Sequence, residues 1–341
     1  MEVIQVVKRF GLCGGMEEYA FRLTEKLSKM GVKVKVLCEV QLTSTQDDII
    51  VIELGKGISK PRWLSHIQFS NKVSIWVKNN VKRNEIVHSH ERISCHHVTT
   101  IHSTLFNFPK KGLPGLRKYM NEYLEKREMS SKRLKKVVPV SHLISKEIKV
   151  KFPFVKNVLN EPIPPSISPI NCSRKKPITN MPIIGFIGKE WKRKGLPKLI
   201  QIWRAITQKY PNAKLCLAGF PKNEDIGLTN QEASNVELLG FVHKKEDFYS
   251  KIDLLLHPAK KEAYGMVIAE ACSLGIPVVC SKECGASYSK LAVRSLHYSE
   301  SINFWTKEVL NCIDKLDQET SIQLTPSWND TAKSYSILYK S

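Results

Sequence analysis

The chain has 341 residues, of which 42% are hydrophobic and 25% are charged, and its length suits two globular domains of roughly 150 residues each. Its 53 Lys and Arg residues exceed its 32 Asp and Glu residues, and the net charge of +21 favours an anionic partner, either a membrane surface or a phosphorylated substrate. The sequence contains no apolar stretch of membrane-spanning length, no Cys-x-x-Cys pair and no motif of a nucleic-acid-binding module. We therefore expect a cytosolic protein with reduced thiols, no metal site and no nucleic-acid partner.

The first part of the chain alternates between the hydrophobic periods of strand and helix. The first residues, MEVIQVV, indicate a strand and not a secretory leader, and Tyr19, Leu23 and Leu27 then recur at helical spacing. Further strands are predicted at 32–39, 49–54, 85–90, 97–102 and 136–141, and helices at 16–31, 70–83 and 115–131. This order predicts a parallel sheet that is covered by helices.

The alternation stops near residue 160, where the segment 160–182 carries six prolines and little periodicity. A second series follows, with strands predicted at 182–188, 213–219, 252–258 and 276–281 and helices at 195–210, 246–252 and 265–275. The predicted fold class is therefore α/β, with two Rossmann-like doubly wound domains. In such a pair we expect the ligand in the crevice that the domains face, at the carboxyl ends of the strands.

The segment EAYGMVIAEACSLGIPVV carries two glutamates, Glu262 and Glu270, around a predicted helix start. Glu262 follows a strand and lies just above the carboxyl edge of the predicted sheet, whereas Glu270 lies within the helix. The free backbone amides at the helix start offer an anion site between them. On these residues alone, one solvent-facing Glu and one ordinary helix Glu remain an equally good interpretation.

Two glycine-containing loops and a histidine-rich segment carry further candidates. The loop GKEWKRKG places Arg193 and Lys194 between a strand and a helix, where they suit a diphosphate, although a basic surface loop remains an alternative. Gly14 and Gly15 follow the first strand and let backbone amides approach a phosphate or a sugar closely, or they form a plain turn. The histidines of EIVHSHERISCHHVTTIH lack zinc-site spacing, and we place the adjacent pair His96 and His97 in a surface turn.

The order E-x7-E, small residues, Gly-x-Pro and an apolar strand is similar to the signature of retaining nucleotide-sugar glycosyltransferases with the GT-B fold. The run DLLLHPAKKEAYGMVIAEACSLGIPVV most resembles the bacterial enzymes that add hexoses to the lipopolysaccharide core. The resemblance extends to the Gly-Gly loop, the GKEWKRKG loop and the terminal WNDTAKSYSILY segment, so it covers most of the chain.

The resemblance implies a division of the chain and a reaction. Residues 1–165 would form an acceptor-side domain, 166–182 a Pro-rich linker, 183–325 a nucleotide-sugar-binding domain, and 326–341 a C-terminal helix that packs back on the N-terminal domain. The implied reaction transfers a hexose from a nucleoside diphosphate sugar to a lipid-linked saccharide, with retention at the anomeric carbon. Same-face attack, with the departing phosphate as the base, is the implied mechanism.

By the same resemblance, Glu262 lies beside the donor sugar and Glu270 hydrogen-bonds the ribose. Both then act as hydroxyl acceptors, and the positive charge is expected elsewhere in the site. The implied donor-binding residues are Gly14, Gly15, Tyr264, Gly265, Met266 and Glu270.

The implied catalytic residues are Glu262, Arg193, Lys194 and His102. Arg193 and Lys194 offset the charge that develops on the leaving diphosphate. His102 matches a position where related enzymes place a His or an Asp beside the transferred sugar, and His90 is the next candidate. Because the chain contains no Asp-x-Asp pair, we expect neither a metal nor another cofactor besides the sugar nucleotide as co-substrate.

A basic region, 110–136, begins at Lys110 and ends at Lys136. Its cations are interleaved with apolar residues, and the set is Lys110, Lys111, Leu113, Leu116, Arg117, Lys118, Tyr119, Tyr123, Lys132, Arg133, Leu134, Lys135 and Lys136. Such a surface suits an anionic leaflet or an acceptor phosphate, although a solvated helix face remains an alternative. We expect a cytoplasmic protein that is peripheral at the inner face of the cytoplasmic membrane. Its rivals are a transferase with a soluble acceptor and, in a different class, a basic nucleic-acid-binding protein.

Overall fold

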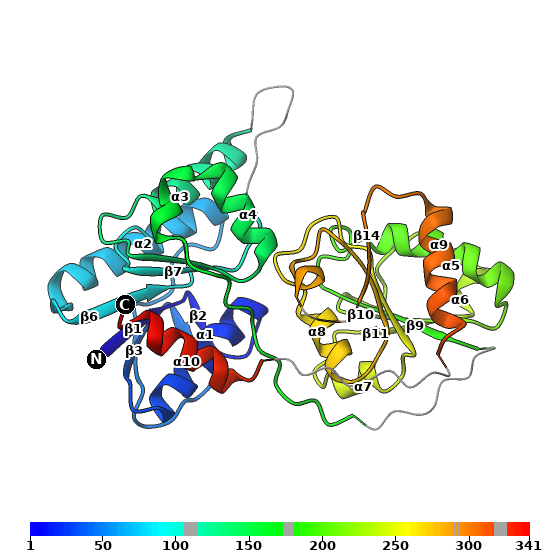
Figure 1. The fold of residues 1–341 in the computed structure, drawn as a ribbon, viewed down its shortest axis with the longest axis horizontal. Helices are drawn as coiled ribbons and strands as arrows, with labels where there is room; N and C mark the ends of the chain where they lie inside the picture. Colours follow the sequence, from blue (N-terminus) through cyan, green and yellow to red (C-terminus); the bar gives the residue numbers. More distant parts are fainter. Residues whose placement is uncertain (106–114, 173–180, 290, 292, 317–325) are drawn as a thin grey trace. The chain divides into compact units, whose positions relative to one another are not determined.

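The computed structural model describes residues 1–105, 115–172, 181–289, 291, 293–316 and 326–341. The chain divides into two compact units, Met1–Ser166 together with Pro326–Ser341, and Ile167–Thr325. Each unit has its own six-stranded sheet with helices packed on it (Figure 1). The predicted α/β class with two Rossmann-like domains is therefore confirmed.

The sheet of the first unit has the strand order β5-β3-β1-β6-β7-β8, and all of these pairings are parallel. Its strands are β1 (Glu2–Val6), β3 (Lys33–Cys38), β5 (Ile50–Glu53), β6 (Glu85–Ser89), β7 (Val98–Ile101) and β8 (Lys136–Pro139). A short parallel pair, β2 (Arg9–Phe10) and β4 (Val40–Gln41), follows β1 and β3 along the chain. Strand β1 is buried on both faces, which explains its nearly continuous apolar sequence.

Helices cover both faces of this sheet. They are α1 (Gly15–Lys29), α2 (Arg62–Asn80), α3 (Leu116–Met129), α4 (His142–Lys151) and α10 (Trp328–Leu338), with a 3-10 turn, η1 (Pro153–Val158). Helix α1 buries Tyr19 and Leu23 in one apolar cluster with Tyr335 of α10, so the C-terminal helix belongs to the first unit and lies beside α1 (Figure 1). A separate cluster joins Phe69 of α2 to Ile4 of β1 on the other face.

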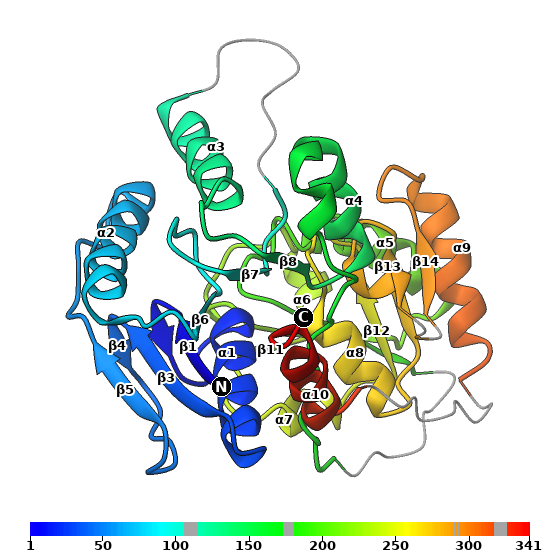
Figure 2. The same cartoon turned by 60° about the vertical axis from the view of Figure 1, so that its left-hand side comes forward.

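The second unit repeats the same topology, with strand order β11-β10-β9-β12-β13-β14. Figure 2 shows its strands β13 and β14 side by side. Its strands are β9 (Ile183–Ile187), β10 (Lys214–Ala218), β11 (Val236–Gly240), β12 (Leu254–His257), β13 (Val278–Ser281) and β14 (Arg294–Leu296). Its helices are α5 (Leu196–Lys209), α6 (Asn230–Ala233), α7 (Glu246–Tyr249), α8 (Met266–Ser273) and α9 (Ile302–Ile313), with a 3-10 turn, η2 (Gly285–Tyr288). Trp203 of α5 and Trp305 of α9 share one core cluster with Phe186 of β9.

The sequence prediction omits β11, β14, α4, α6 and α9, and it starts α2 at residue 70 although the helix begins at Arg62. Strand β14 has three residues and helix α6 has four, which is too short for either period to repeat. Helix α9 carries Ile302, Trp305, Val309 and Ile313 at helical spacing, so its segment held a periodic signal that the prediction missed.

Both sheets reverse their strand order beside the first strand of the unit. In the first unit β1 lies between β3 and β6, and in the second unit β9 lies between β10 and β12. Ligands of doubly wound folds bind at the carboxyl ends of the strands at this switch point. The loops after β1, β6, β9 and β12 are therefore the loops that position a site.

We expect Trp305→Ala to lower the free energy of unfolding of the second unit by about 3–5 kcal/mol, the usual range for removing a large aromatic side chain from a core. Trp305 is fully buried, and its indole Nε1 donates to the carbonyl oxygen of His297 at 3.1 Å. The control is Phe304→Ala, because the neighbouring Phe304 is 39% exposed. Urea unfolding followed by circular dichroism measures both variants, and equal losses would contradict this packing.

Candidate functional site

Two loops of the second unit bring three predicted site residues together at the carboxyl edge of its sheet. The loop between β9 and α5 carries Arg193 and Lys194, and the loop between β12 and α8 carries Glu262. The backbone N–H of Lys260 donates to the carbonyl oxygen of Arg193 at 2.9 Å, which joins the two loops directly. Since β9 and β12 are neighbours at the switch point, residues 69 positions apart in the sequence meet here.

Glu262 lies at the centre of the charges in these loops. Its Oε2 accepts a hydrogen bond from Arg193 Nη1 at 3.0 Å, and Lys194 Nζ lies 3.6 Å from the same oxygen. Arg193 also donates from Nε to Glu190 Oε2 at 2.8 Å. The side chain of Arg193 is 38% exposed and that of Glu262 is 16% exposed. An anionic ligand can therefore reach the guanidinium and compete with the two carboxylates for it.

The carboxylates set the ionisation of Arg193. Burial by itself lowers the pKa of Arg193, but Glu262 and Glu190 outweigh burial and raise this pKa above its ordinary value. The expectation that the positive charge lies away from Glu262 is wrong. Arg193 and Lys194 lie on the Glu262 carboxylate itself, because the two loops leave adjacent strands.

The backbone around Glu262 is held in place on both sides. Its carbonyl oxygen accepts a hydrogen bond from the backbone N–H of Gly285 at 3.0 Å. Gly265 is the N-cap of α8 with φ of 98°, a left-handed conformation that favours glycine. A Cβ on Gly195 would lie 1.7 Å from the carbonyl oxygen of Pro258, so only glycine lets the two loops approach this closely. The amides at the start of α8 are therefore fixed beside Glu262.

Tyr264 and Met266 flank the cap residue Gly265. The Tyr264 side chain is buried, and burial raises the pKa of its hydroxyl to about 12. The carbonyl oxygen of Tyr264 accepts a hydrogen bond from the backbone N–H of Ala286 at 2.7 Å. Met266 is the first residue of α8, where backbone N–H groups lack an intrahelical partner. Backbone groups are therefore what this segment offers to a ligand.

Glu270 lies in α8 and is 4% exposed. Its Oε1 accepts a hydrogen bond from Lys245 Nζ at 2.7 Å, and its Oε2 accepts one from the Tyr249 hydroxyl at 2.6 Å. Burial, and after it the Glu270 carboxylate, raises the pKa of Tyr249 well above its ordinary value. A ligand hydroxyl that bonds to Glu270 therefore shares the carboxylate with two protein donors, and a carboxylate has lone pairs enough for this.

Sequence reasoning missed Lys245 and Tyr249 as partners of Glu270. Lys245 is the N-cap of the short helix α7 and Tyr249 is its last residue, and the spacing of four places both on one helix face. The helical spacing is the one signal in the sequence that could have linked them. The segment itself, KEDFY, is too short and too ordinary to indicate a contact with α8.

His257 ends β12 close to the basic loop, and it was not predicted to be part of the site. It is fully buried, stacks on Phe186, and neither ring nitrogen has a hydrogen-bond partner among the described residues. Burial, followed by the charges of Lys194 and Arg193, holds the pKa of His257 well below its usual range. The imidazole beside the two cations is therefore neutral.

In the first unit, the predicted Gly-Gly loop lies between β2 and α1. Gly14 is the N-cap of α1 and Gly15 is its first residue. A Cβ on Gly14 would lie 2.5 Å from Glu17 Oε2, whereas a Cβ on Gly15 would meet nothing within 4 Å. Glu17 accepts a hydrogen bond from Arg9 Nε at 3.1 Å. The absent side chain of Gly14 thus makes room for an ion pair, and open space lies at Gly15.

His102 follows β7 and is partly exposed, and its Nε2 lies 2.9 Å from Nδ1 of His90, which follows β6. The ring of Tyr19 from α1 meets His102 edge-on, with ring centroids 4.8 Å apart. Burial lowers the pKa of His102 to about 3, against an opposite effect of Glu91. His102 is therefore a neutral imidazole at pH 7, able to donate one hydrogen bond and accept another.

The placement of His96 and His97 in a surface turn is wrong for His96. His96 is fully buried, and burial lowers its pKa to about 3. Ser131, which follows α3, donates from its hydroxyl to the carbonyl oxygen of His96 at 3.0 Å. His97 is half-buried, and its Nδ1 accepts a hydrogen bond from the backbone N–H of Val87 at 3.0 Å. The segment joins adjacent strands of the sheet and is therefore covered.

The basic region is described in part. Its residues Lys110, Lys111 and Leu113 lie outside the described residues. Three large apolar side chains of α3 are at least half exposed, namely Leu116 (67%), Tyr119 (57%) and Tyr123 (50%). Their spacing of three and four residues places them on one face of the helix, and Arg117 and Lys118 are exposed beside them.

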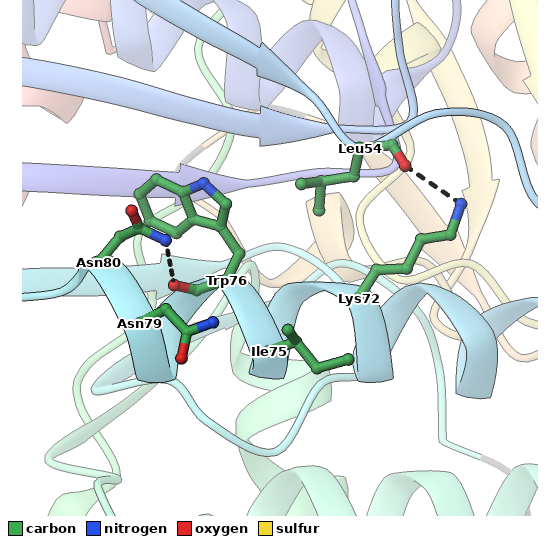
Figure 3. A pocket seen from close by; sticks show the side chains of 6 residues that line it. All are labelled: Leu54, Lys72, Ile75, Trp76, Asn79 and Asn80. Atoms are coloured by element: carbon green, nitrogen blue, oxygen red, sulfur yellow. Dashed lines mark hydrogen bonds between the residues drawn. The ribbon is translucent and has the colours of Figure 1, made fainter.

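A pocket in the first unit lies away from the predicted site residues (Figure 3). It is lined by Leu54, Lys72, Ile75, Trp76, Asn79 and Asn80. Lys72 Nζ donates to the carbonyl oxygen of Leu54 at 3.1 Å, and Asn80 Nδ2 donates to that of Trp76 at 2.9 Å. Lys72 thus links α2 to the residue after β5, and Asn80 bonds within α2. The polar groups of this pocket therefore have structural partners.

The described ranges contain no group of three or more His, Cys, Asp or Glu side chains arranged to hold a metal ion. All nine cysteines are free, and burial raises the pKa of Cys272 and of Cys284 to about 12. In the same part of the chain, no helix combines the length and the apolar character that crossing a membrane requires.

Two family descriptions match successive parts of the chain. "Glycosyltransferase Family 4" matches residues 13–164, which lie in the first unit. "Glycosyl transferases group 1" matches residues 171–289, which lie in the second unit. Together the two matches contain every residue that the sequence analysis predicts for the site.

Curated relatives match this chain over parts of their length. The capsular polysaccharide biosynthesis glycosyltransferase CapM of Staphylococcus aureus is 29% identical over 154 residues, 43% of this chain and 40% of CapM. The phosphatidylinositol N-acetylglucosaminyltransferase gpi3 subunit of Schizosaccharomyces pombe is 25% identical over 305 residues, 79% of this chain and 63% of the subunit. The lipopolysaccharide glucosyltransferase WaaG of Escherichia coli is 28% identical over 106 residues, 30% of this chain and 28% of WaaG. The chain thus spans less than two thirds of each relative.

Solved structures share the fold over nearly the whole chain. The crystal structure of WaaG has a TM-score of 0.76 at 17% identity and covers 98% of this chain and 95% of its own. Anabaena Alr3699/HepE in complex with UDP and glucose has a TM-score of 0.66 at 16% identity and covers 99% of this chain and 95% of its own. With a family 4 domain followed by a group 1 domain on this two-unit fold, the chain belongs to the GT-B glycosyltransferases.

Proposed function

We propose that the protein is a retaining glycosyltransferase that transfers a hexose from a nucleoside diphosphate sugar to a lipid-linked saccharide of the lipopolysaccharide-core kind. Membership of the GT-B glycosyltransferases supports glycosyl transfer, and WaaG supports the kind of acceptor. The observation that carries the proposal is the contact of Glu262 with Arg193 and Lys194 at the start of α8. It combines an acceptor for sugar hydroxyls with two cations for a diphosphate.

The two glutamates have different tasks in this donor site. When a diphosphate takes over Arg193 and Lys194, the Glu262 carboxylate becomes available to the hydroxyls of the transferred sugar. Glu270 keeps its protein donors and uses its remaining lone pairs for the ribose hydroxyls. The amides at Tyr264, Gly265 and Met266 face phosphate and sugar at the positive end of α8.

In the proposed reaction, charge stabilisation by side chains takes the place of a metal. As the bond between the anomeric carbon and the phosphate oxygen breaks, negative charge grows on the leaving diphosphate, and Arg193 and Lys194 stabilise it. The acceptor hydroxyl forms its bond to the anomeric carbon on the same face and gives its proton to the departing phosphate. The configuration is retained, and no further cofactor takes part.

In the first unit, the proposal assigns ligand contacts to Gly14, Gly15 and His102. The amides at Gly14 and Gly15 are assigned to a sugar or phosphate group, and the open space beside Gly15 leaves room for one. His102 contacts a hydroxyl of the transferred sugar, for which a neutral imidazole is suited because it offers a donor and an acceptor.

The acceptor is met at an anionic membrane surface, where the protein is peripheral. Helix α3 exposes Leu116, Tyr119 and Tyr123 on one face with Arg117 and Lys118 beside them. Apolar side chains that insert between headgroups and cations that pair with them bind anionic leaflets together. The relative named phosphatidylinositol N-acetylglucosaminyltransferase is consistent with a lipid acceptor.

The direct test of the function is a screen of UDP-, GDP- and ADP-hexoses for release of the nucleoside diphosphate, with and without a lipid-linked saccharide. We expect one donor to be turned over, and the product to keep the anomeric configuration of the donor by proton NMR. Turnover of none of these donors, or inversion at the anomeric carbon, would contradict the proposal.

We expect Glu270→Ala to weaken binding of the nucleoside diphosphate by about 1–3 kcal/mol, because the ribose hydroxyls lose their buried acceptor. Isothermal titration calorimetry measures the change in Kd. The control is Tyr249→Phe, which removes one partner of Glu270 and leaves the carboxylate in place. A Kd that stays the same in folded Glu270→Ala protein would remove Glu270 from the ribose site.

We expect Arg193→Ala and Lys194→Ala each to lower kcat about a hundredfold, because their interaction with the diphosphate is strongest in the transition state. Glu262→Gln should likewise lower turnover more than nucleoside diphosphate affinity. The control is Lys192→Ala, since Lys192 is exposed in the same loop. Activity within twofold of wild type for both Arg193→Ala and Lys194→Ala would exclude the assigned role. All assays are run with and without a chelator, and loss of activity in chelator would contradict the metal-free mechanism.

Cosedimentation with vesicles tests the membrane surface. The protein should bind vesicles that contain anionic lipid, and binding should fall as salt screens the charges. Replacing Lys132, Arg133, Lys135 and Lys136 by Gln should weaken it. The control replaces four exposed lysines of the second unit, namely Lys222, Lys244, Lys307 and Lys315, and removes the same charge. Equal losses in the two variants would assign binding to net charge, and no binding at low salt would exclude the membrane role.

A further inference from the structure

A chain of hydrogen bonds runs from His102 into the core of the first unit. His102 Nε2 lies 2.9 Å from His90 Nδ1, and His90 Nε2 lies 2.9 Å from Oε1 of Gln5. The amide Nε2 of Gln5 donates to the hydroxyl of Tyr339 at 3.2 Å. Gln5 belongs to β1 and Tyr339 follows α10, two elements that lie beside each other in Figure 1. A side chain that faces the surface is thus joined to a fully buried amide.

The amide of Gln5 determines which nitrogen of each imidazole carries the proton. Its Oε1 has no hydrogen and can only accept, so His90 Nε2 must donate to it. A neutral imidazole has a single N–H, and His90 Nδ1 must therefore accept from its neighbour. The neighbour is His102 Nε2, which consequently carries the proton of His102. The lone pair of His102 is left on Nδ1.

Further contacts connect the Gln5 amide to a larger network. Gln5 is completely buried in the central strand of the sheet. The Tyr339 hydroxyl that receives its N–H also lies 2.6 Å from His88 Nδ1, and His88 Nε2 lies 2.8 Å from the hydroxyl of Thr100. Rotating the amide would place its N–H at His90 and its oxygen at Tyr339, and the partners on both sides would have to change with it.

The two histidines in this series of hydrogen bonds, His90 and His102, are both neutral at pH 7. Burial lowers the pKa of His90 well below its usual range, and His88 and His102 lower it further. Burial likewise lowers the pKa of His102, although the Glu91 carboxylate acts in the opposite direction. The assignment of one proton to each ring is therefore consistent with the electrostatics around the pair.

We propose that Gln5 is a positioning residue which, through His90, fixes His102 as the Nε2–H tautomer and presents its Nδ1 lone pair to a hydroxyl of the transferred sugar. The proposal rests on the proposed function, in which His102 contacts that sugar. The opposite tautomer would direct an N–H from Nδ1, and the hydroxyl would then have to accept instead of donate. Gln5 and His90 thereby select the polarity of the contact without touching the substrate.

The tautomer is measured directly by long-range nitrogen–proton NMR on protein labelled with nitrogen-15 in its histidines. In the wild-type protein we expect His102 to show a protonated Nε2 and an unprotonated Nδ1. The opposite assignment would overturn the proposal whatever any variant does. This measurement needs neither the sugar nucleotide nor the saccharide acceptor, so it tests the tautomer independently of the proposed function. The proposed function fails instead if the wild-type protein transfers no sugar.

Variants test whether Gln5 is the cause. Gln5→Met keeps the shape of the side chain and removes the acceptor, so His102 should populate both tautomers, and kcat should fall about tenfold with KM changed less than about twofold, as for one lost hydrogen bond. The control is Thr100→Val, which removes a buried partner of His88 and leaves the Gln5–His90–His102 contacts in place. A single unchanged tautomer or an unchanged kcat in folded Gln5→Met protein would overturn the proposal. A loss of kcat in Thr100→Val as large as in Gln5→Met would overturn it as well.

Discussion

The parallel pairing of both six-stranded sheets is the constraint on which the rest of this structure depends. Parallel neighbours require a crossover, so every strand is followed by a connection over one face, and the loops that leave the strands gather at one edge. Because the strand order reverses beside β1 and beside β9, the loops at these positions come from strands that are adjacent in space and distant in sequence. Gly14 with His90 in the first unit, and Arg193 with Glu262 in the second, lie on such loops, and His102 follows the next strand, β7.

Charge pairing organises the edge of the second sheet. Arg193 is partly desolvated, and an unpaired guanidinium there would be unfavourable, so Glu262 and Glu190 provide carboxylates for it. The same contact orients Arg193 for the proposed donor site, since a diphosphate is negatively charged like the carboxylates that the guanidinium already faces. Electrostatic groups that are oriented before the ligand arrives need little reorganisation during the reaction. Glycine at position 195 permits this arrangement, because any Cβ would meet the carbonyl oxygen of Pro258.

Buried polar groups organise the first unit in a different way. Gln5, His88 and His90 lie inside the sheet and would each be unfavourable without hydrogen-bond partners. Tyr339 and Tyr335, which come from the C-terminal end of the chain, provide part of these partners. The packing of α10 on α1 and the orientation of His102 are consequently linked through one network. Such a network specifies a unique arrangement only when every member is satisfied, and this makes the last residues of the chain part of the core of the first unit.

The amino-acid sequence by itself determined most of the strands and helices in their order, the two α/β domains, and the family signature of E-x7-E with its glycine and basic loops. These features are local, because a period of two or of 3.6 residues and a short motif can be recognised within one segment. The tertiary structure decided which side chains meet: Arg193 on Glu262, Lys245 and Tyr249 on Glu270, and Gln5 behind His90. It also decided that His96 is buried and that short elements such as β14 form. These outcomes depend on which strands become neighbours and what covers them, and no period within a single segment carries that information.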